Sequence, residues 1–188
     1  GEGVLGNCGA AGDEGEVRSG RRGVGIVGDA EHESVALGGA FHGRLFGTLA
    51  ATDRPGYRLP FRPLTPGISI CERDLAELDA ALSEDTVAAL IVEPVQGEGG
   101  VRVLDAGFLR ELRAVTASRN IALIFDEIQC GMGRTGTLFA YEQMGIVPDM
   151  VTLAKPIAGG LPMGAVLMTD AIASTIKAGD HGTTFGGG

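Results

Sequence analysis

Short runs of apolar residues alternate along the chain with segments whose apolar residues recur at helical spacing. The runs are continuous, which is typical of strands that are buried on both faces of a parallel sheet. We predict strands at residues 24–27 (with 34–36 as an extension), 87–92, 121–125, 150–154 and 165–168. We predict helices at residues 72–82, 108–118 and 171–177, and a further helix near the N-terminus. The N-terminal helix is expected to be the weakest, because it contains Gly12, Gly15 and Gly20.

Strands that alternate with helices predict an α/β fold with a mainly parallel central sheet flanked by helices. The 188 residues are enough to bury a substantial core as one domain. Residues 54–66 are rich in proline and predict a loop rather than a domain boundary. No internal repeat or linker is visible.

Three polar residues directly follow predicted strands: Glu93, Asp126 and Lys155. In an open parallel sheet the ligand crevice lies outside the carboxyl ends of the strands. We therefore expect these three side chains to converge on one crevice, as a catalytic constellation.

Lys155 is one of only two lysines in the chain. An ammonium at the end of a buried strand is costly, because desolvation favours the neutral amine. A neutral lysine amine is a nucleophile that commonly forms a Schiff base with a carbonyl. The alternative is a lysine that merely begins a surface loop.

Composition excludes several classes of function. The net charge of -9 and the pI near 4.8 argue against a nucleic-acid-binding surface. No apolar stretch approaches the roughly 18 residues that span a bilayer. The three cysteines are widely spaced and the three histidines lack metal-ligand spacing, so we expect a reducing compartment and no metal site.

Two other motifs give weaker interpretations. The run from Ile124 to Glu127 is similar to a Walker B strand, but an NTPase needs a Gly-Lys-Ser/Thr loop, and none is present. The segment 131–136 fits GxGxxG, but it does not open a convincing βαβ unit, so a turn-rich loop is the better account.

A Gly-containing turn at residues 7–12 precedes the N-terminal helix, where free backbone N–H groups suit a phosphate. Pyridoxal 5'-phosphate (PLP) combines an aldehyde, a phosphate and a ring nitrogen, and its chemistry needs a lysine and a carboxylate on the pyridinium nitrogen. Lys155 and Asp126 suit these two roles.

Five ordered motifs make the chain similar to a known family. They are Ala40-Phe41-His42-Gly43-Arg44, Val92-Glu93-Pro94-Val95-Gln96-Gly97-Glu98-Gly99-Gly100, Phe125-Asp126-Glu127-Ile128-Gln129-Cys130-Gly131, Thr152-Leu153-Ala154-Lys155-Pro156 and Gly179-Asp180-His181-Gly182-Thr183-Thr184-Phe185-Gly186-Gly187. With them the chain resembles the class III (ornithine-type) PLP-dependent aminotransferases over nearly all of its length.

The resemblance implies a role for each of eleven residues. Catalysis would rest on Lys155, which forms the Schiff base and moves a proton, and on Asp126, which binds the pyridinium nitrogen. The expected cofactor-binding residues are Gly9 and Ala10 at the phosphate, Phe41 and Ile128 on the two ring faces, Gln129 at the 3'-oxygen, and Thr184 at the phosphate of a neighbouring subunit. The expected substrate-binding residues are Arg44, Glu93 and Glu98.

The resemblance also implies the reaction and its setting. The residues around Lys155 and Thr184 favour N2-acetyl-L-ornithine as amino donor and 2-oxoglutarate as acceptor. The expected setting is a cytoplasmic homodimer, and any organelle-targeting segment of the parent protein would lie before these residues. The rivals are ornithine, succinylornithine and 4-aminobutyrate as donors, and a non-catalytic folded fragment.

The chain departs from the family pattern at Cys8-Gly9-Ala10-Ala11-Gly12-Asp13, where Ser-Gly-Ala-Glu-Ala-Asn is usual. We expect residues 1–188 to be a partial PLP-binding large domain of the type I aminotransferase fold. The N-terminal arm and the C-terminal small domain would lie outside it, and the 188 residues alone would be inactive.

Overall fold

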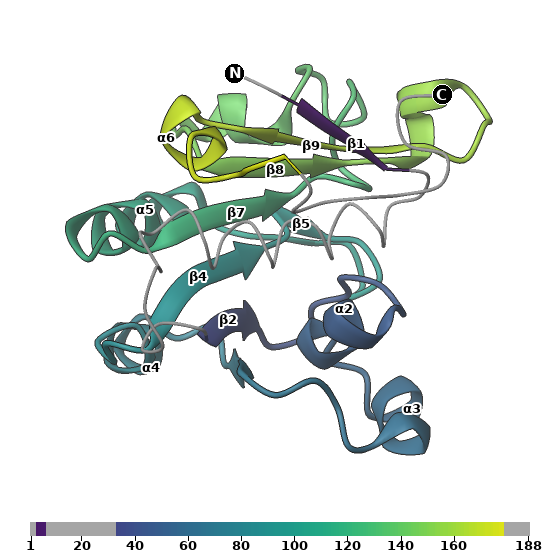
Figure 1. Cartoon of the computed structure of the whole chain (residues 1–188). Helices are drawn as coiled ribbons and strands as arrows, with labels where there is room; N and C mark the ends of the chain where they lie inside the picture. The colour runs from purple at the N-terminus through teal and green to yellow at the C-terminus, as the bar shows by residue number, and fades with distance from the viewer. Residues whose placement is uncertain (1–2, 7–32, 179–188) are drawn as a thin grey trace.

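The computed structural model describes residues 3–6 and 33–178. A seven-stranded sheet in the order β1-β9-β8-β7-β4-β2-β3 forms its centre (Figure 1). The strands of this sheet are β1 (Gly3–Gly6), β2 (Glu33–Leu37), β3 (Ile68–Cys71), β4 (Val87–Val92), β7 (Ala122–Asp126), β8 (Met150–Leu153) and β9 (Gly164–Met168). A small antiparallel pair consists of β5 (Val95–Gln96) and β6 (Arg102–Val103).

Five neighbouring strands, β3, β2, β4, β7 and β8, are parallel. Strand β9 is antiparallel to β8, and β1 is antiparallel to β9. The predicted α/β fold with a mainly parallel sheet is confirmed.

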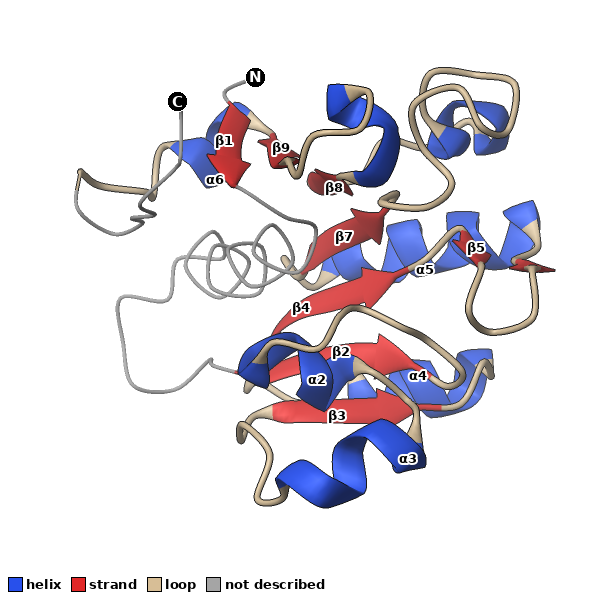
Figure 2. Ribbon diagram, turned by 90° about the vertical axis from the view of Figure 1, so that its right-hand side faces the viewer, coloured by secondary structure: helices blue, strands red, loops and turns tan. Residues whose placement is uncertain are grey.

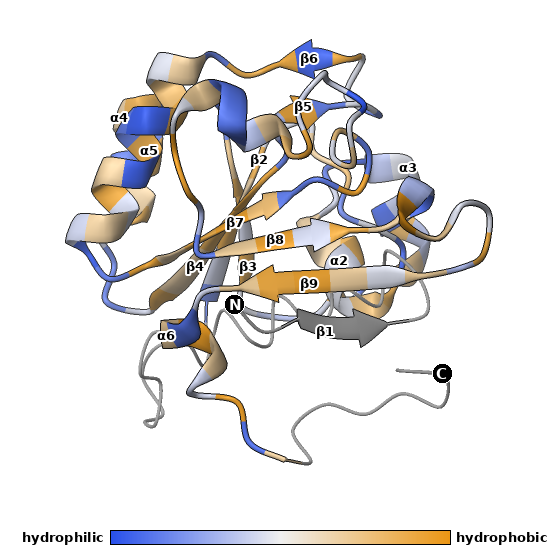
Figure 3. Cartoon of the chain, turned by 90° about the horizontal axis from the view of Figure 1, so that it is seen from above, coloured by the Kyte–Doolittle hydropathy of each residue, from blue (hydrophilic) through white to orange (hydrophobic). Residues whose placement is uncertain are grey.

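Helices cover both faces of the sheet (Figure 2). The helical segments are α2 (Phe46–Ala51), α3 (Pro55–Arg58), η1 (Leu59–Phe61), α4 (Leu75–Ala81), α5 (Ala106–Ser118), η2 (Ala140–Met144), η3 (Lys155–Ala158) and α6 (Asp170–Ala173). Strand residues alternate between the two faces: Leu90 and Val92 of β4 pack in the core beneath α4 and α5, whereas Ala89 and Ile91 pack in the core that includes Ala51 of α2. Burial on both faces explains the continuous apolar runs in the sequence. Figure 3 shows hydrophobic residues along the central strands and hydrophilic residues on α4 and α5.

The strands predicted at 87–92, 121–125, 150–154 and 165–168 are confirmed, with ends that differ by one residue at most. The predicted helices are present with shifted ends. Helix α4 begins at Leu75 rather than at residue 72, because the Asp74 carboxylate accepts hydrogen bonds from the backbone N–H groups of Ala76 and Glu77, both at 3.0 Å. Helix α6 ends at Ala173 rather than at residue 177.

One prediction was wrong, and several elements were missed. Residues 54–66 are not simply a loop, because α3 and η1 form there, each with a proline in its first turn. Sequence analysis also missed α2, whose six residues are too few to show helical spacing, and the edge strand β3. Residues 34–36 lie within β2, whereas the strand predicted at 24–27 and the glycine-containing helix lie outside the described residues.

None of the helices in residues 33–178 combines the length and the apolar composition that a membrane-spanning helix needs.

Candidate active site

The carboxyl ends of the parallel strands form one edge of the sheet, and a cavity of about 400 Å³ lies there. Eight of the predicted site residues line it: Phe41, Arg44, Glu93, Glu98, Asp126, Ile128, Gln129 and Lys155. Their convergence follows from the pairing of the strands, since Val92 of β4 lies opposite Phe125 of β7, and the next residues are Glu93 and Asp126. The predicted crevice with Glu93, Asp126 and Lys155 is confirmed. Gly9, Ala10 and Thr184 lie outside the described residues.

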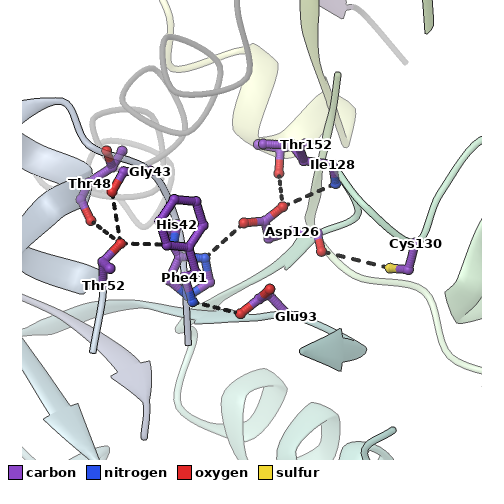
Figure 4. A network of polar contacts seen from close by, with 10 residues as sticks. All are labelled: Phe41, His42, Gly43, Thr48, Thr52, Glu93, Asp126, Ile128, Cys130 and Thr152. Atoms are coloured by element: carbon purple, nitrogen blue, oxygen red, sulfur yellow. Dashed lines mark hydrogen bonds and ion pairs between the residues drawn. The ribbon is translucent and has the colours of Figure 1, made fainter. Parts of the chain in front are cut away.

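Asp126 is the last residue of β7, and it is 5% exposed. Its Oδ2 lies 2.8 Å from Nδ1 of His42. Its Oδ1 accepts hydrogen bonds from the backbone N–H of Ile128 at 3.1 Å and from the hydroxyl of Thr152 at 3.4 Å (Figure 4). The carboxylate is therefore held in one orientation at the wall of the cavity.

His42 was not among the predicted site residues, although it stands in a motif that carries the family resemblance. Its side chain is buried, and its backbone N–H donates to the Thr52 hydroxyl at 2.9 Å (Figure 4). Burial lowers the pKa of the imidazole, but the hydrogen bond and charge of Asp126, with the charge of Glu93, outweigh burial and raise it. His42 is therefore a buried hydrogen-bonding partner of Asp126. The signal in the sequence was a single histidine within an otherwise apolar and glycine-rich segment, which does not by itself reveal a distant partner.

Glu93 follows β4 and is 5% exposed. Its Oε2 accepts a hydrogen bond from the backbone N–H of Phe41 at 2.8 Å. Burial, together with the charge of Asp126, raises the pKa of Glu93 to about 7, against the opposing effects of His42, the Phe41 N–H and Lys155.

Lys155 begins η3, with Ala154 between it and the end of β8, and its side chain is exposed in the cavity wall. The expectation of an amine desolvated at the end of a buried strand is wrong for these residues, because β8 ends at Leu153 and the chain turns outward before Lys155. The backbone of Lys155 has a φ of 40°, in the left-handed region that non-glycine residues rarely adopt. Such strain is concentrated at functional sites, where the surrounding structure maintains it.

Arg44 and Glu98 lie at the exposed rim of the cavity. The guanidinium carbon of Arg44 lies 3.9 Å from the centre of the Tyr57 ring, a cation–π contact that restrains the arginine. The backbone carbonyl of Glu98 accepts a hydrogen bond from Arg54 at 2.7 Å, which ties the Glu98 loop to the segment before α3. The rim thus carries one restrained cation and one anion.

The position of the Gln129 side chain depends on Gly97, a glycine in another segment. The end of its side chain occupies the space where a Cβ on Gly97 would lie. Gly97 follows β5, so the loop after β5 and the segment after β7 approach this closely because position 97 has no side chain.

The alternative motifs receive no structural support. Residues 131–136 form consecutive turns, as predicted, rather than the start of a helix. Among the described residues no group of three or more histidine, cysteine or acidic side chains is arranged to hold a metal ion. Burial and the charges of Glu127 and Asp126 raise the pKa of the Cys130 thiol to about 12, so this cysteine is unreactive.

Comparison with known proteins identifies the family. The family profile described as "Aminotransferase class-III" matches residues 2–188. The chain is 47% identical over 183 residues to the acetylornithine aminotransferase of Methanocaldococcus jannaschii, covering 96% of this chain and 46% of that protein. It is 50% identical over 157 residues to the mitochondrial acetylornithine aminotransferase of Alnus glutinosa, covering 83% and 35%.

A solved structure of the ornithine aminotransferase from Toxoplasma gondii, described as having partial occupancy of PLP at its active site, matches with a TM-score of 0.92 and 33% identity. The match covers 99% of this chain and 45% of that one. The chain therefore spans less than half the length of these relatives. The profile match over residues 2–188 shows that the chain belongs to the class III aminotransferases.

Proposed function

We propose that this chain forms the cofactor-binding large domain of an aminotransferase that moves the terminal amino group of N2-acetyl-L-ornithine to 2-oxoglutarate. The products would be N-acetyl-L-glutamate 5-semialdehyde and L-glutamate, in arginine biosynthesis. The observation that carries the proposal is a single cavity lined by an amine, a buried carboxylate paired with a histidine, and a rim arginine. The names of the archaeal and plant relatives support the choice of amino donor.

The cavity residues fit PLP. The Asp126 carboxylate is buried and fixed by three donors, and it still faces the cavity, so it offers a charged acceptor to a ring N–H. Phe41 and Ile128 provide apolar surface for a flat ring, and Gln129 provides an amide for a ring oxygen. When bound, PLP supplies an aldehyde that bonds reversibly to amines and a ring that accepts electrons.

The chain's own residues have distinct tasks in this proposal. Lys155 Nζ would hold the cofactor through its aldehyde and would serve as the proton carrier of the site, which its exposed position in the cavity permits. Asp126 keeps its negative charge against the ring nitrogen, and His42 maintains the orientation of Asp126. The Arg44 guanidinium would bind a substrate carboxylate in a fork geometry at the rim, where Glu98 also lies, while Glu93 lies buried beside Asp126.

Ornithine is the second candidate donor, because the Toxoplasma gondii enzyme shares the fold at 33% identity. Succinylornithine and 4-aminobutyrate remain rivals from the sequence, as does a folded chain without activity. A homodimer, in which Thr184 reaches the partner's phosphate site, is part of the proposal. A cytoplasmic location stays a prediction, since the Alnus glutinosa relative is named mitochondrial.

The test is reductive trapping of the cofactor. The purified protein is mixed with PLP, reduced with borohydride and digested, and the peptides are mapped. We expect the reduced cofactor on Lys155. We do not expect it on Lys177, which follows α6 at the opposite edge of the sheet, where the Thr169 N–H donates to the Asp149 carbonyl at the start of β8.

Lys155→Arg is the matched variant, because it keeps the positive charge and removes the nucleophilic amine. This variant should lose both the label and the yellow absorbance of the cofactor adduct. A label on Lys177 alone would contradict the assignment. Measuring the glutamate that the full-length enzyme forms from acetylornithine and from ornithine separates the two donors.

A further inference from the structure

Two buried carboxylates and one imidazole come together at the floor of the cavity. Glu93 and Asp126 follow paired residues of neighbouring strands, and His42 comes from the segment after β2, the next strand of the sheet. All three side chains are buried. Two adjacent carboxylates in a buried site repel each other when both are ionised, so one of them tends to hold a proton.

The hydrogen bonds distinguish the two carboxylates. Among the described residues, Asp126 accepts hydrogen bonds from the Ile128 N–H at 3.1 Å and the Thr152 hydroxyl at 3.4 Å, and its Oδ2 also lies 2.8 Å from His42 Nδ1. In the same described part of the chain, Glu93 accepts one hydrogen bond, from the Phe41 N–H at 2.8 Å (Figure 4). Because donors stabilise the ionised form of a carboxyl group, the negative charge belongs on Asp126 and the proton on Glu93.

We infer that Glu93 is a positioning residue that carries the exchangeable proton of this cluster, so that the negative charge of the pair resides on Asp126. Its second oxygen, Oε1, takes no part in the Phe41 hydrogen bond and can carry the proton. Through Oε2, Glu93 also holds the backbone that presents Phe41 and His42.

The electrostatic surroundings agree with this assignment. Burial and the charge of Asp126 raise the pKa of Glu93 to about 7, while His42 and Lys155 act in the opposite direction. The other charged groups that line the cavity, Arg44 and Glu98, are exposed at its rim. Glu93 therefore exchanges its proton near neutral pH.

The assignment of the proton to Glu93 does not depend on the proposed function. The usefulness of that assignment for catalysis rests on the proposed function. An ionised Asp126 is useful only if it faces a cationic ring nitrogen, as in the proposed cofactor site. The test therefore uses the cofactor-free protein.

The experiment is a pH titration by difference infrared spectroscopy, from about pH 5 to about pH 9, which follows the carbonyl stretch of protonated carboxyl groups. We expect a band that is lost with a midpoint of about 7. The band should be absent in Glu93→Gln, which keeps an acceptor for the Phe41 N–H. It should persist in Glu98→Gln, an exposed carboxylate of the same cavity, and in Glu127→Gln, a buried carboxylate outside it.

Isotope labelling of the unmodified protein keeps the inference testable if Glu93→Gln does not fold. Carboxyl-labelled glutamate should shift the band, and carboxyl-labelled aspartate should leave it in place. Absence of the band, a shift with labelled aspartate, or loss of the band in Glu127→Gln would each overturn the inference. Failure of borohydride trapping at Lys155 would overturn the proposed function and leave the infrared result intact.

Discussion

At the scale of single residues, the cavity is defined by side chains whose hydrogen bonds leave them one orientation. Asp126 is held by His42, Ile128 and Thr152, and each partner comes from a different part of the chain. The Thr52 hydroxyl, which lies 2.9 Å from the Gly43 carbonyl, in turn receives the His42 backbone N–H. This fixed arrangement is what a catalytic carboxylate requires, because displacement of about 1 Å already costs activity.

Asp126→Asn keeps the shape of the side chain and removes its charge. In the full-length enzyme we expect the rate of the half-reaction with amino donor to fall by roughly two orders of magnitude or more, since the proposed charge-assisted contact to the cofactor ring is lost. Rapid-mixing absorbance measurements check this, with cofactor content measured in the same sample. Near-normal rates in a cofactor-loaded variant would refute the role of the charge.

Gly97→Ala tests the contact between Gly97 and Gln129. The new Cβ would displace the end of a flexible side chain rather than backbone, so we expect the free energy of unfolding to change by less than about 1 kcal/mol. Cofactor affinity should fall several-fold, because Gln129 leaves the cavity wall. Gly56→Ala in α3 is the control, since nothing lies within 4 Å of the position that its new methyl group would take. Equal affinities for the two variants would contradict the prediction.

At the scale of elements, helix α4 shows how a short helix depends on its cap and on packing against the sheet. Helix α4 is seven residues long, and it buries Leu78 against the core shared with α5. An isolated helix of this length is not stable in water. The Asp74 cap and the buried leucine therefore determine where α4 forms.

Asp74→Ala removes the acceptor for the N–H groups of Ala76 and Glu77. We expect a loss of about 1 kcal/mol in the free energy of unfolding, measured by urea denaturation. Asp74→Asn should retain most of that stability, because asparagine caps helices nearly as well. Equal losses in both variants would point to charge rather than capping.

At the scale of the whole molecule, the buried cluster links stability to pH. Glu93 has a pKa raised from 4.5 to about 7, so the folded state binds its proton more tightly than the unfolded state. This stabilising contribution is present in full below about pH 4.5 and is lost as the pH rises through about 7. The raised pKa of His42 also stabilises the folded state at low pH. This contribution is lost as the pH rises through the pKa that His42 has in the folded state.

Glu93→Gln removes this titration. We expect the stability of the variant relative to the unmodified protein to rise by on the order of 2 to 3 kcal/mol between about pH 4.5 and about pH 8. Denaturant titrations at several pH values measure the difference, with Glu98→Gln as the exposed control. A difference that does not change with pH would contradict the assignment.

The cavity is open in the described part of the chain, because Lys155, Arg44 and Glu98 are all exposed. We expect the 188 residues alone to bind PLP weakly and to produce no measurable glutamate from acetylornithine, since water is not excluded and the amine is poorly positioned. The assay uses purified chain freed of host aminotransferases. Steady-state turnover would prove this prediction wrong.

Local patterns in the sequence determined the central strands and the residues at their ends. The apolar runs before Glu93, Asp126 and Lys155 identify β4, β7 and β8, because burial on both faces of a sheet requires continuous apolar side chains. Their convergence followed from a general property of parallel sheets. The family resemblance then indicated the remaining cavity residues.

Only the tertiary structure decided which strands are neighbours, and therefore which distant side chains meet. Strand β4 lies between β2 and β7, and the segment after β2 passes the end of β4, where the Phe41 N–H bonds to Glu93, so that His42 reaches Asp126, 84 residues away in the chain. The tertiary structure also decides that β9 runs antiparallel to β8. It places Lys155 at the start of η3 with its side chain exposed. The physical reason is that the spacing of apolar residues indicates which faces of a segment are buried. Strand pairing depends instead on packing between segments that are far apart in the sequence.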